Sequence, residues 1–169
     1  PAAPAGGTLR PIRFVHRGAV VEVDGLAPTT TVLQWLREHA RRMGTKEGCN
    51  EGDCGACTVV VAELAEADGD AAAVPTRATV VGGLVLRPVN ACLRYLPTLD
   101  GKALLTVEDL RAIAGGELHP VQQALVDCHA LQCGFCTPGI VMTLSNTYER
   151  HLAAGSRPLR QELADDLAG

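Results

Sequence analysis

Residues 48–57 read GCNEGDCGAC and place Cys49, Cys54 and Cys57 in a Cys-x4-Cys-x2-Cys spacing. A fourth cysteine, Cys92, follows downstream. This is the spacing of a plant-type [2Fe-2S] cluster, in which three thiolates reach two iron atoms from one loop and the fourth comes from a separate segment. Three glycines in the loop favour such a wrapped conformation, because glycine lets backbone amides approach the sulfurs. The loop therefore predicts an iron-sulfur site.

Zinc is the alternative occupant of these cysteines, because zinc also binds four thiolates. Zinc sites usually use two short Cys-x2-4-Cys knuckles. The pairs Cys49–Cys54 and Cys54–Cys57 share Cys54, so the loop supplies only one separate knuckle. The spacing and the glycines together favour the cluster, and zinc or unrelated thiols stay open as alternatives.

A second cysteine group lies at residues 132–139, which read QCGFCTPG and contain Cys133 and Cys136. Their Cys-x2-Cys spacing precedes a predicted helix N-terminus, which lowers thiol pKa values and favours anions. Half of another cluster, half of a zinc site and a redox dithiol all fit this local chemistry. A thioredoxin-like dithiol expects a βαβ setting, whereas the flanking sequence here predicts helices.

Composition and charge exclude several other classes. The 169 residues carry a net charge of -4 and only 3% aromatic residues, which argues against a nucleic-acid partner. The longest apolar runs are far shorter than the roughly 20 residues that cross a bilayer. Seven cysteines cannot all pair, and no secretion signal opens the chain, so we expect reduced thiols, no membrane association and a cytoplasmic location.

The first part of the chain alternates short β-favouring runs with one helical pattern. We expect strands at 11–16, 19–23, 58–64 and 79–89, with a hairpin tip at 65–76. Thr31 and Gln34 predict a capping box for a three-turn helix over residues 32–43, in which Trp35 faces the core. This order of elements predicts an α+β fold with a small mixed sheet curled over one helix.

The pattern becomes helical after Asp100. Thr106 and Asp109 begin a helix that Gly115-Gly116 ends, and further helices are expected at 120–129, from Thr137 to about residue 152, and at 156–167. Four such elements with short connections predict a small helix bundle. The predicted domains are therefore 9–100 and 101–169.

Three motifs in this order, at 48–59, at 89–93 (VNACL) and at 132–139, resemble the iron-sulfur region of the molybdenum hydroxylases, the xanthine dehydrogenase and aldehyde oxidase family. Residues 119–129 are most similar to the small subunit of bacterial xanthine dehydrogenases. The resemblance implies a β-grasp [2Fe-2S] ferredoxin domain followed by a four-helix [2Fe-2S]-binding domain. The implied metal ligands are Cys49, Cys54, Cys57 and Cys92 for the first cluster, and Cys133 and Cys136 for the second.

The sequence departs from the family pattern at its end. The family supplies the other two ligands of the second cluster from a Cys-x-Cys after the fourth helix, and no such pair precedes Gly169. Cys128 does not correspond to a ligand in the family, and we expect it to be a buried thiol. We interpret the helical domain as C-terminally incomplete, with the flavin-binding portion further on.

The resemblance also implies a function. Electrons would pass from a molybdopterin centre through two [2Fe-2S] clusters to FAD during oxidation of hypoxanthine or xanthine, with NAD as acceptor. The partners would be a molybdopterin-binding large subunit and an FAD-binding domain within a hetero-oligomer, and Gln132 would lie against the pterin. No residue here is expected to be catalytic. A free-standing ferredoxin, or an aldehyde oxidoreductase or CO-dehydrogenase-like subunit of the same family, is the alternative.

Overall fold

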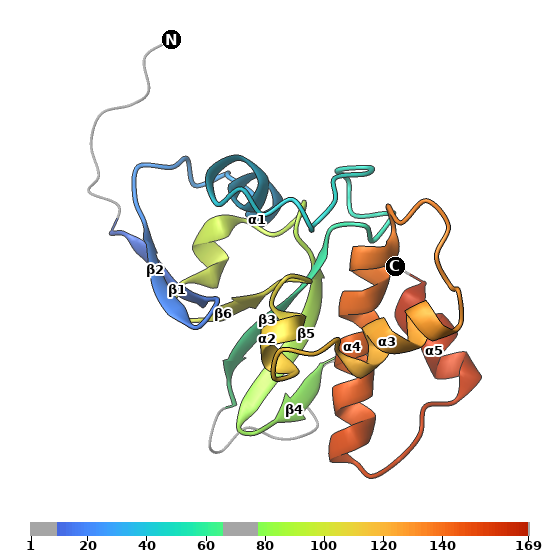
Figure 1. Cartoon of the computed structure of the whole chain (residues 1–169). Helices are drawn as coiled ribbons and strands as arrows, with labels where there is room; N and C mark the ends of the chain where they lie inside the picture. Colours follow the sequence, from blue (N-terminus) through green and yellow to red (C-terminus); the bar gives the residue numbers. More distant parts are fainter. Residues whose placement is uncertain (1–9, 66–77, 169) are drawn as a thin grey trace.

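A six-stranded mixed sheet dominates the computed structural model, which describes residues 10–65 and 78–168 (Figure 1). The strands lie in the order β2-β1-β6-β3-β5-β4. Their bounds are β1 Ile12–His16, β2 Ala19–Val23, β3 Thr58–Leu64, β4 Thr79–Val81, β5 Leu84–Asn90 and β6 Ala103–Leu105.

Strand β3 is covered on both faces, which explains its continuous apolar sequence. Side chains alternate between the faces of a strand. Val59 and Val61 pack into the core beneath α1, Val32–Gln34, whereas Val60 packs against α4, Thr137–Ala153. The sheet is therefore the middle layer between α1 and the helices of the second part. The α+β prediction, a ferredoxin-like sheet followed by a helical part, is confirmed.

The predicted helix at 32–43 starts as expected but ends early. The capping box of Thr31 and Gln34 is present, and Trp35 is buried against Phe14. After α1 the chain forms a π-helix over Trp35–His39, and Arg41 then takes a left-handed φ of 53° that ends the helix. Met43 is consequently half exposed instead of lying on a buried helix face.

The single strand predicted at 79–89 is wrong, because the chain reverses within it. Gly82 and Gly83 both have positive φ, which glycine adopts without steric cost, and they connect β4 to β5 as an antiparallel hairpin. The hairpin tip predicted at 65–76 falls outside the described residues except for Ala65.

The sheet also extends past Asp100, where the sequence predicted only helices. Strand β6 pairs parallel with β1 and antiparallel with β3, so it closes the centre of the sheet. Three residues are too few to produce a periodic pattern, which is why the sequence did not reveal this strand.

The helices that follow lie near their predicted positions. They are α2 Leu110–Ile113, α3 Pro120–Asp127, α4 and α5 Arg160–Leu167, and Gly115 and Gly116 follow α2 with positive φ as expected of a helix end. A short 3-10 helix, η3 Leu96–Leu99, precedes β6. Helix α4 packs on α3, on α5 and on strands β3, β4 and β5, so α3 to α5 gather beside one side of the sheet (Figure 1).

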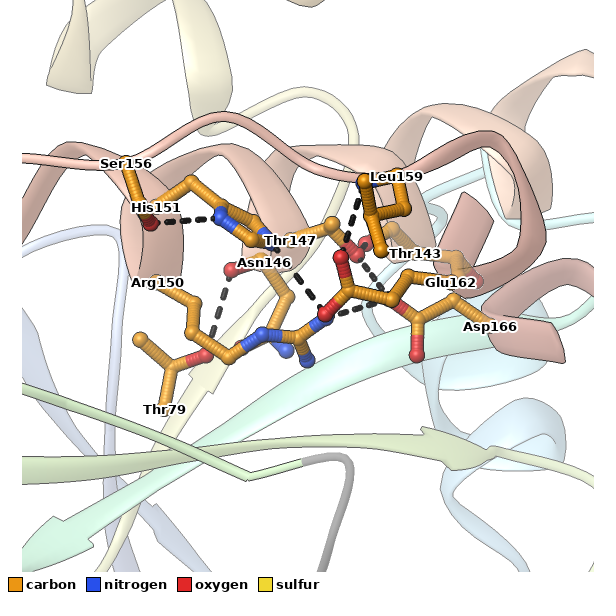
Figure 2. A network of polar contacts seen from close by, with 10 residues as sticks. All are labelled: Thr79, Thr143, Asn146, Thr147, Arg150, His151, Ser156, Leu159, Glu162 and Asp166. Atoms are coloured by element: carbon orange, nitrogen blue, oxygen red, sulfur yellow. Dashed lines mark hydrogen bonds and ion pairs between the residues drawn. The ribbon is translucent and has the colours of Figure 1, made fainter. Parts of the chain in front are cut away.

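Polar contacts hold α4 in place from two directions (Figure 2). The Thr79 hydroxyl of β4 donates a hydrogen bond to the Asn146 carbonyl of α4 at 3.1 Å. Asp166 of α5 accepts from the Thr147 hydroxyl at 2.6 Å and from the Arg150 guanidinium at 2.8 Å. Within the described part of the chain, no helix is both long enough and apolar enough to cross a membrane.

Candidate iron-sulfur sites

The sheet brings the loop at 48–57 together with Cys92. Cys57 directly precedes β3, and Cys92 lies two residues after the end of β5. These strands pair antiparallel with Thr58 opposite Asn90, so the beginning of one meets the end of the other. The Ala91 amide donates to the Cys57 carbonyl at 3.3 Å, and both Cys57 and Cys92 are buried.

Backbone amides point at the sulfurs of the loop. The amides of Glu51 and Cys54 both donate to Cys49 Sγ, and the Cys49 amide donates to Cys54 Sγ, each at 3.4 Å. Sulfur carries the negative charge of a thiolate, and an amide N-H stabilises that charge. The loop is thus built to hold sulfur in its deprotonated form, which is the form that binds a metal.

The thiol pKa values follow from these surroundings. The Glu51 amide, followed by the Cys54 amide, lowers the pKa of Cys49 to about 7. Burial raises the pKa of Cys92 to about 11, and the neighbouring Cys57 thiol adds to this effect through a hydrogen bond and its charge. A smaller contribution from the Cys49 thiol acts in the same direction on the pKa of Cys92.

The donor set fits a [2Fe-2S] cluster. It consists of four cysteine sulfurs with amide donors directed at two of them, and Gly48 leaves room where a Cβ would come within 2.8 Å of Cys54 Sγ. Within 10–65 and 78–168, no three His, Cys, Asp or Glu side chains enclose a position for one metal ion. The fit rests on the chemistry of the donors and on the loop that carries them.

Two side chains clamp the loop to the strands. The Asn90 amide nitrogen donates to the Gly52 carbonyl at 2.7 Å, and the Thr58 hydroxyl donates to the Gly55 carbonyl at 2.7 Å. Both residues belong to the strands that deliver the buried cysteines. The sequence analysis assigned no role to either residue, although Asn90 lies in the VNACL motif that carries Cys92.

The second group lies on the loop between α3 and α4. Gln132, Cys133 and Cys136 line one cavity of about 280 Å³ together with Leu125, Leu131 and Ile140. Both cysteines are exposed, and Cys136 occupies the position that caps the N-terminus of α4. The structure thus brings together the three residues that the sequence singled out here.

Cys128 differs from its expected state. We expected a buried thiol, but Cys128 is exposed at the C-terminal end of α3. It does not line the cavity of Cys133 and Cys136 but faces a separate cavity between α3, α4 and α5. The helix ends at this residue, because His129 follows with a left-handed φ of 49°, so Cys128 does not lie on a buried helix face.

The two cysteine groups border one cleft. Cys54 and Gly55 from the first loop, and Cys136 and Gly139 from the start of α4, all line this cleft of about 370 Å³. Gly139 is a residue that the sequence analysis quoted without a role. The signal for this residue is a glycine within a predicted helix. Glycine lowers helix stability, so its presence there indicates a position where another chain segment packs closely.

Two family models match this chain, one on each part of it. Residues 14–95 match the family model "2Fe-2S iron-sulfur cluster binding domain", and residues 106–169 match the model "[2Fe-2S] binding domain". The first model covers the loop at 48–57 and Cys92, and the second covers Cys133 and Cys136.

Relatives with established names match nearly the whole chain. Xanthine dehydrogenase of Blastobotrys adeninivorans is 35% identical over 94% of this chain, and aldehyde oxidase 1 of Rattus norvegicus is 36% identical over 92%. The chain spans only about 10% of the length of each of these relatives.

A solved structure has the same fold in a chain of similar length. A chain of quinoline 2-oxidoreductase from Pseudomonas putida 86 superposes with a TM-score of 0.57 and 26% identity, covering 96% of this chain and 92% of the other. Two consecutive [2Fe-2S] domains, their cysteine loops and these relatives lead to one assignment: the chain belongs to the iron-sulfur region of the molybdenum hydroxylase family, which includes xanthine dehydrogenase and aldehyde oxidase.

Proposed function

We propose that this chain carries electrons within a molybdenum hydroxylase, between a molybdopterin centre and FAD. The observation that supports the proposal most directly is the loop in which backbone amides donate to Cys49 and Cys54 beside buried Cys57 and Cys92. A bound [2Fe-2S] cluster supplies one-electron chemistry, and its potential depends on hydrogen bonds to sulfur and on burial. The proposed ligands are Cys49, Cys54, Cys57 and Cys92 for the first cluster, with Cys133 and Cys136 as part of the second.

The polypeptide's contribution would be to set the potential and the position of each cluster. The amides of Glu51 and Cys54 offset negative charge at Cys49 Sγ, which favours the reduced, more negative state. Burial of Cys57 and Cys92 excludes water from one side of the site and opposes added charge. The exposed Cys54 lies on the side that borders the second cysteine group.

The second site needs ligands beyond the two on the α3–α4 loop. We propose that a Cys-x-Cys, which the resemblance implies, completes it from a later segment of the protein. Gln132 is exposed on this loop beside Cys133, which supports a contact between its amide and the pterin. The proposed partners are a molybdopterin-binding large subunit on this side and an FAD-binding domain near the first loop, in a cytoplasmic hetero-oligomer.

The substrate that we propose is hypoxanthine or xanthine, with NAD as the acceptor. Aldehydes are the second candidate, because the aldehyde oxidase relative is as similar to this chain as the xanthine dehydrogenase relative. The native complex, purified from its source, decides between them. NAD reduction with xanthine supports the first proposal, and oxidation of aldehydes without turnover of xanthine overturns it in favour of the second.

Metal analysis tests the electron-transfer proposal itself. We would measure iron and acid-labile sulfide per chain in the purified protein, with its intact mass taken from the same sample. Two irons in a chain ending at Gly169 indicate the first cluster, and four in a longer protein indicate both. A colourless protein that contains zinc but no iron overturns the proposal, because the filled d shell of zinc gives no visible absorption.

The same purification distinguishes this proposal from the alternative that the chain is a free-standing ferredoxin. Retention of a large molybdopterin-containing partner through size-exclusion chromatography supports the built-in role. A monomeric red-brown protein that never associates with such a partner would indicate a diffusing shuttle.

A further inference from the structure

The two cysteine groups approach each other through two glycines. Gly55 directly follows Cys54, and Gly139 lies one helical turn after Cys136, whose carbonyl accepts from the Ile140 amide at 3.1 Å. A Cβ built at Gly139 would overlap the Gly55 carbonyl oxygen and come within 3.1 Å of Ala56 Cα. The backbone of α4 therefore lies directly against the backbone of the first loop, with no room for a side chain between them.

Hydrogen bonds to neighbouring residues fix both the loop at Gly55 and helix α4. The Thr58 hydroxyl donates to the Gly55 carbonyl at 2.7 Å, which fixes the loop side. On the other side, Thr79 of β4 donates to the Asn146 carbonyl in the middle of α4 (Figure 2). Asp166 of α5 holds the same stretch of α4 through Thr147 and Arg150. If the loop and the helix moved apart, at least one of these hydrogen bonds would break.

We propose that Gly139 is a positioning residue that sets the separation between the two [2Fe-2S] clusters. This inference rests on the proposed function, because it concerns the distance between the ligands of the two sites. The contact links Cys54 to Cys136 through Gly55 and Gly139, so its closeness determines how near the two ligand sets lie. An electron that passed between the bound clusters would oxidise one and reduce the other by one electron, with no bond formed or broken.

Gly139→Ala is the direct test, because the added methyl group must displace either the N-terminal turn of α4 or the loop at Gly55. The measurement uses the complete native protein with both clusters reduced by dithionite. Each reduced [2Fe-2S] cluster is paramagnetic, and the dipolar interaction between two such centres falls with the cube of their separation. We expect a smaller magnetic splitting in the electron paramagnetic resonance spectrum of G139A, with the midpoint potential of each cluster unchanged.

Ala153→Val is the matched control, because it adds bulk to the exposed far end of the same helix. This variant should keep the wild-type splitting. An unchanged splitting in G139A, or the same loss of splitting in A153V, overturns the inference. So does a wild-type protein that holds two reduced clusters without any magnetic interaction.

Thr58→Val keeps the inference testable if G139A binds no iron. The substitution preserves the shape of the side chain and removes the stronger of two hydrogen bonds to the Gly55 carbonyl, since the Thr58 amide still donates to it at 3.1 Å. A smaller splitting in T58V with full iron content supports the inference, and a larger splitting overturns it, because loosening the contact should only let the clusters move apart. Iron content separates this result from failure of the proposed function, since absence of either cluster from the wild-type protein would refute the two-cluster function itself.

Discussion

The side-chain amide of Asn90 donates a hydrogen bond of 2.7 Å to the carbonyl of Gly52. This contact ties the end of β5, which leads to Cys92, to the loop that carries the other three cysteines. Gly52 has a φ of 85°, and a Cβ at this position would overlap the side chain of Leu93. Asn90 therefore holds a tightly turned segment in the one conformation that its surroundings allow.

Asn90→Ala should weaken retention of the first cluster. The substitution leaves the Gly52 carbonyl without its donor, and losing a partner of a part-buried polar group costs about 1 kcal/mol or more. We expect faster bleaching of the visible absorption when an iron chelator is added. Gln123→Ala, which removes an exposed contact with Asp127 on α3, is the control and should bleach at the wild-type rate. Equal rates in wild type and N90A would contradict the clamp.

Cys92→Ser should remove the first cluster, whereas Cys128→Ser should not. Cys92 is buried beside Cys57, and Cys128 is exposed at the end of α3, where it lines a cavity that contains none of the candidate ligands. A serine hydroxyl at neutral pH does not replace a buried thiolate ligand. Iron and sulfide per chain should fall by two each in C92S and stay unchanged in C128S. Loss of iron from C128S would mean that the second site uses a cysteine that we place outside it.

The metal-free chain should alkylate at Cys49 before Cys92. Amide donors lower the pKa of Cys49 from 9.0 to about 7, so most of this thiol is deprotonated above pH 7. Burial raises the pKa of Cys92 to about 11, so it stays protonated throughout the neutral range. Because the thiolate is the nucleophile, iodoacetamide should modify Cys49 with a midpoint near pH 7.

Peptide mapping by mass spectrometry between pH 6 and pH 9 reads this order directly. Unfolding in guanidinium provides the control, because both thiols should then react at similar rates. A folded apo chain in which Cys92 is modified as fast as Cys49 at pH 7.5 would refute the assignment of the amide donors.

The candidate sites could be read from local sequence, whereas several elements of the sheet around them could not. Cysteine spacing is a local property, and the loop at 48–57 carries its glycines within the same ten residues. The meeting of Cys57 with Cys92 depends on the register between β3 and β5, which no local pattern contains. The resemblance to a family supplied that pairing, and the structure explains it through the opposition of Thr58 and Asn90.

The missed elements share a physical cause. Strand β6 and the β4–β5 turn at Gly82-Gly83 are short, and their pairing partners are decided by the rest of the sheet. The Gly-Gly pair is itself a turn signal, because both positions of a tight hairpin turn favour residues that adopt positive φ. Gly139 needed the packed structure, because its role concerns a loop more than eighty residues earlier in the chain.

Glu63→Gln should lower the stability of the sheet at neutral pH. The Glu63 carboxylate of β3 lies 2.8 Å from both Arg87 of β5 and Lys102, which immediately precedes β6. Its hydrogen bond with Lys102, followed by that with Arg87, lowers the pKa of Glu63 below the ordinary 4.5. The free energy of unfolding should fall by about 1 kcal/mol, because each partly exposed ion pair contributes up to about that amount.

This contribution of Glu63 should disappear in acid and not in base. A carboxyl group whose pKa is lower in the folded state stabilises the protein fully above the unfolded pKa, and the effect is lost as pH falls through the folded pKa. Urea unfolding should therefore give a constant difference between wild type and E63Q from pH 8 down to about pH 5.5, which shrinks below pH 4.5. Glu117→Gln, in an exposed turn, should cause little change at any pH. A difference that persists undiminished at the lowest pH where the protein still folds would mean that Glu63 acts through packing instead of charge.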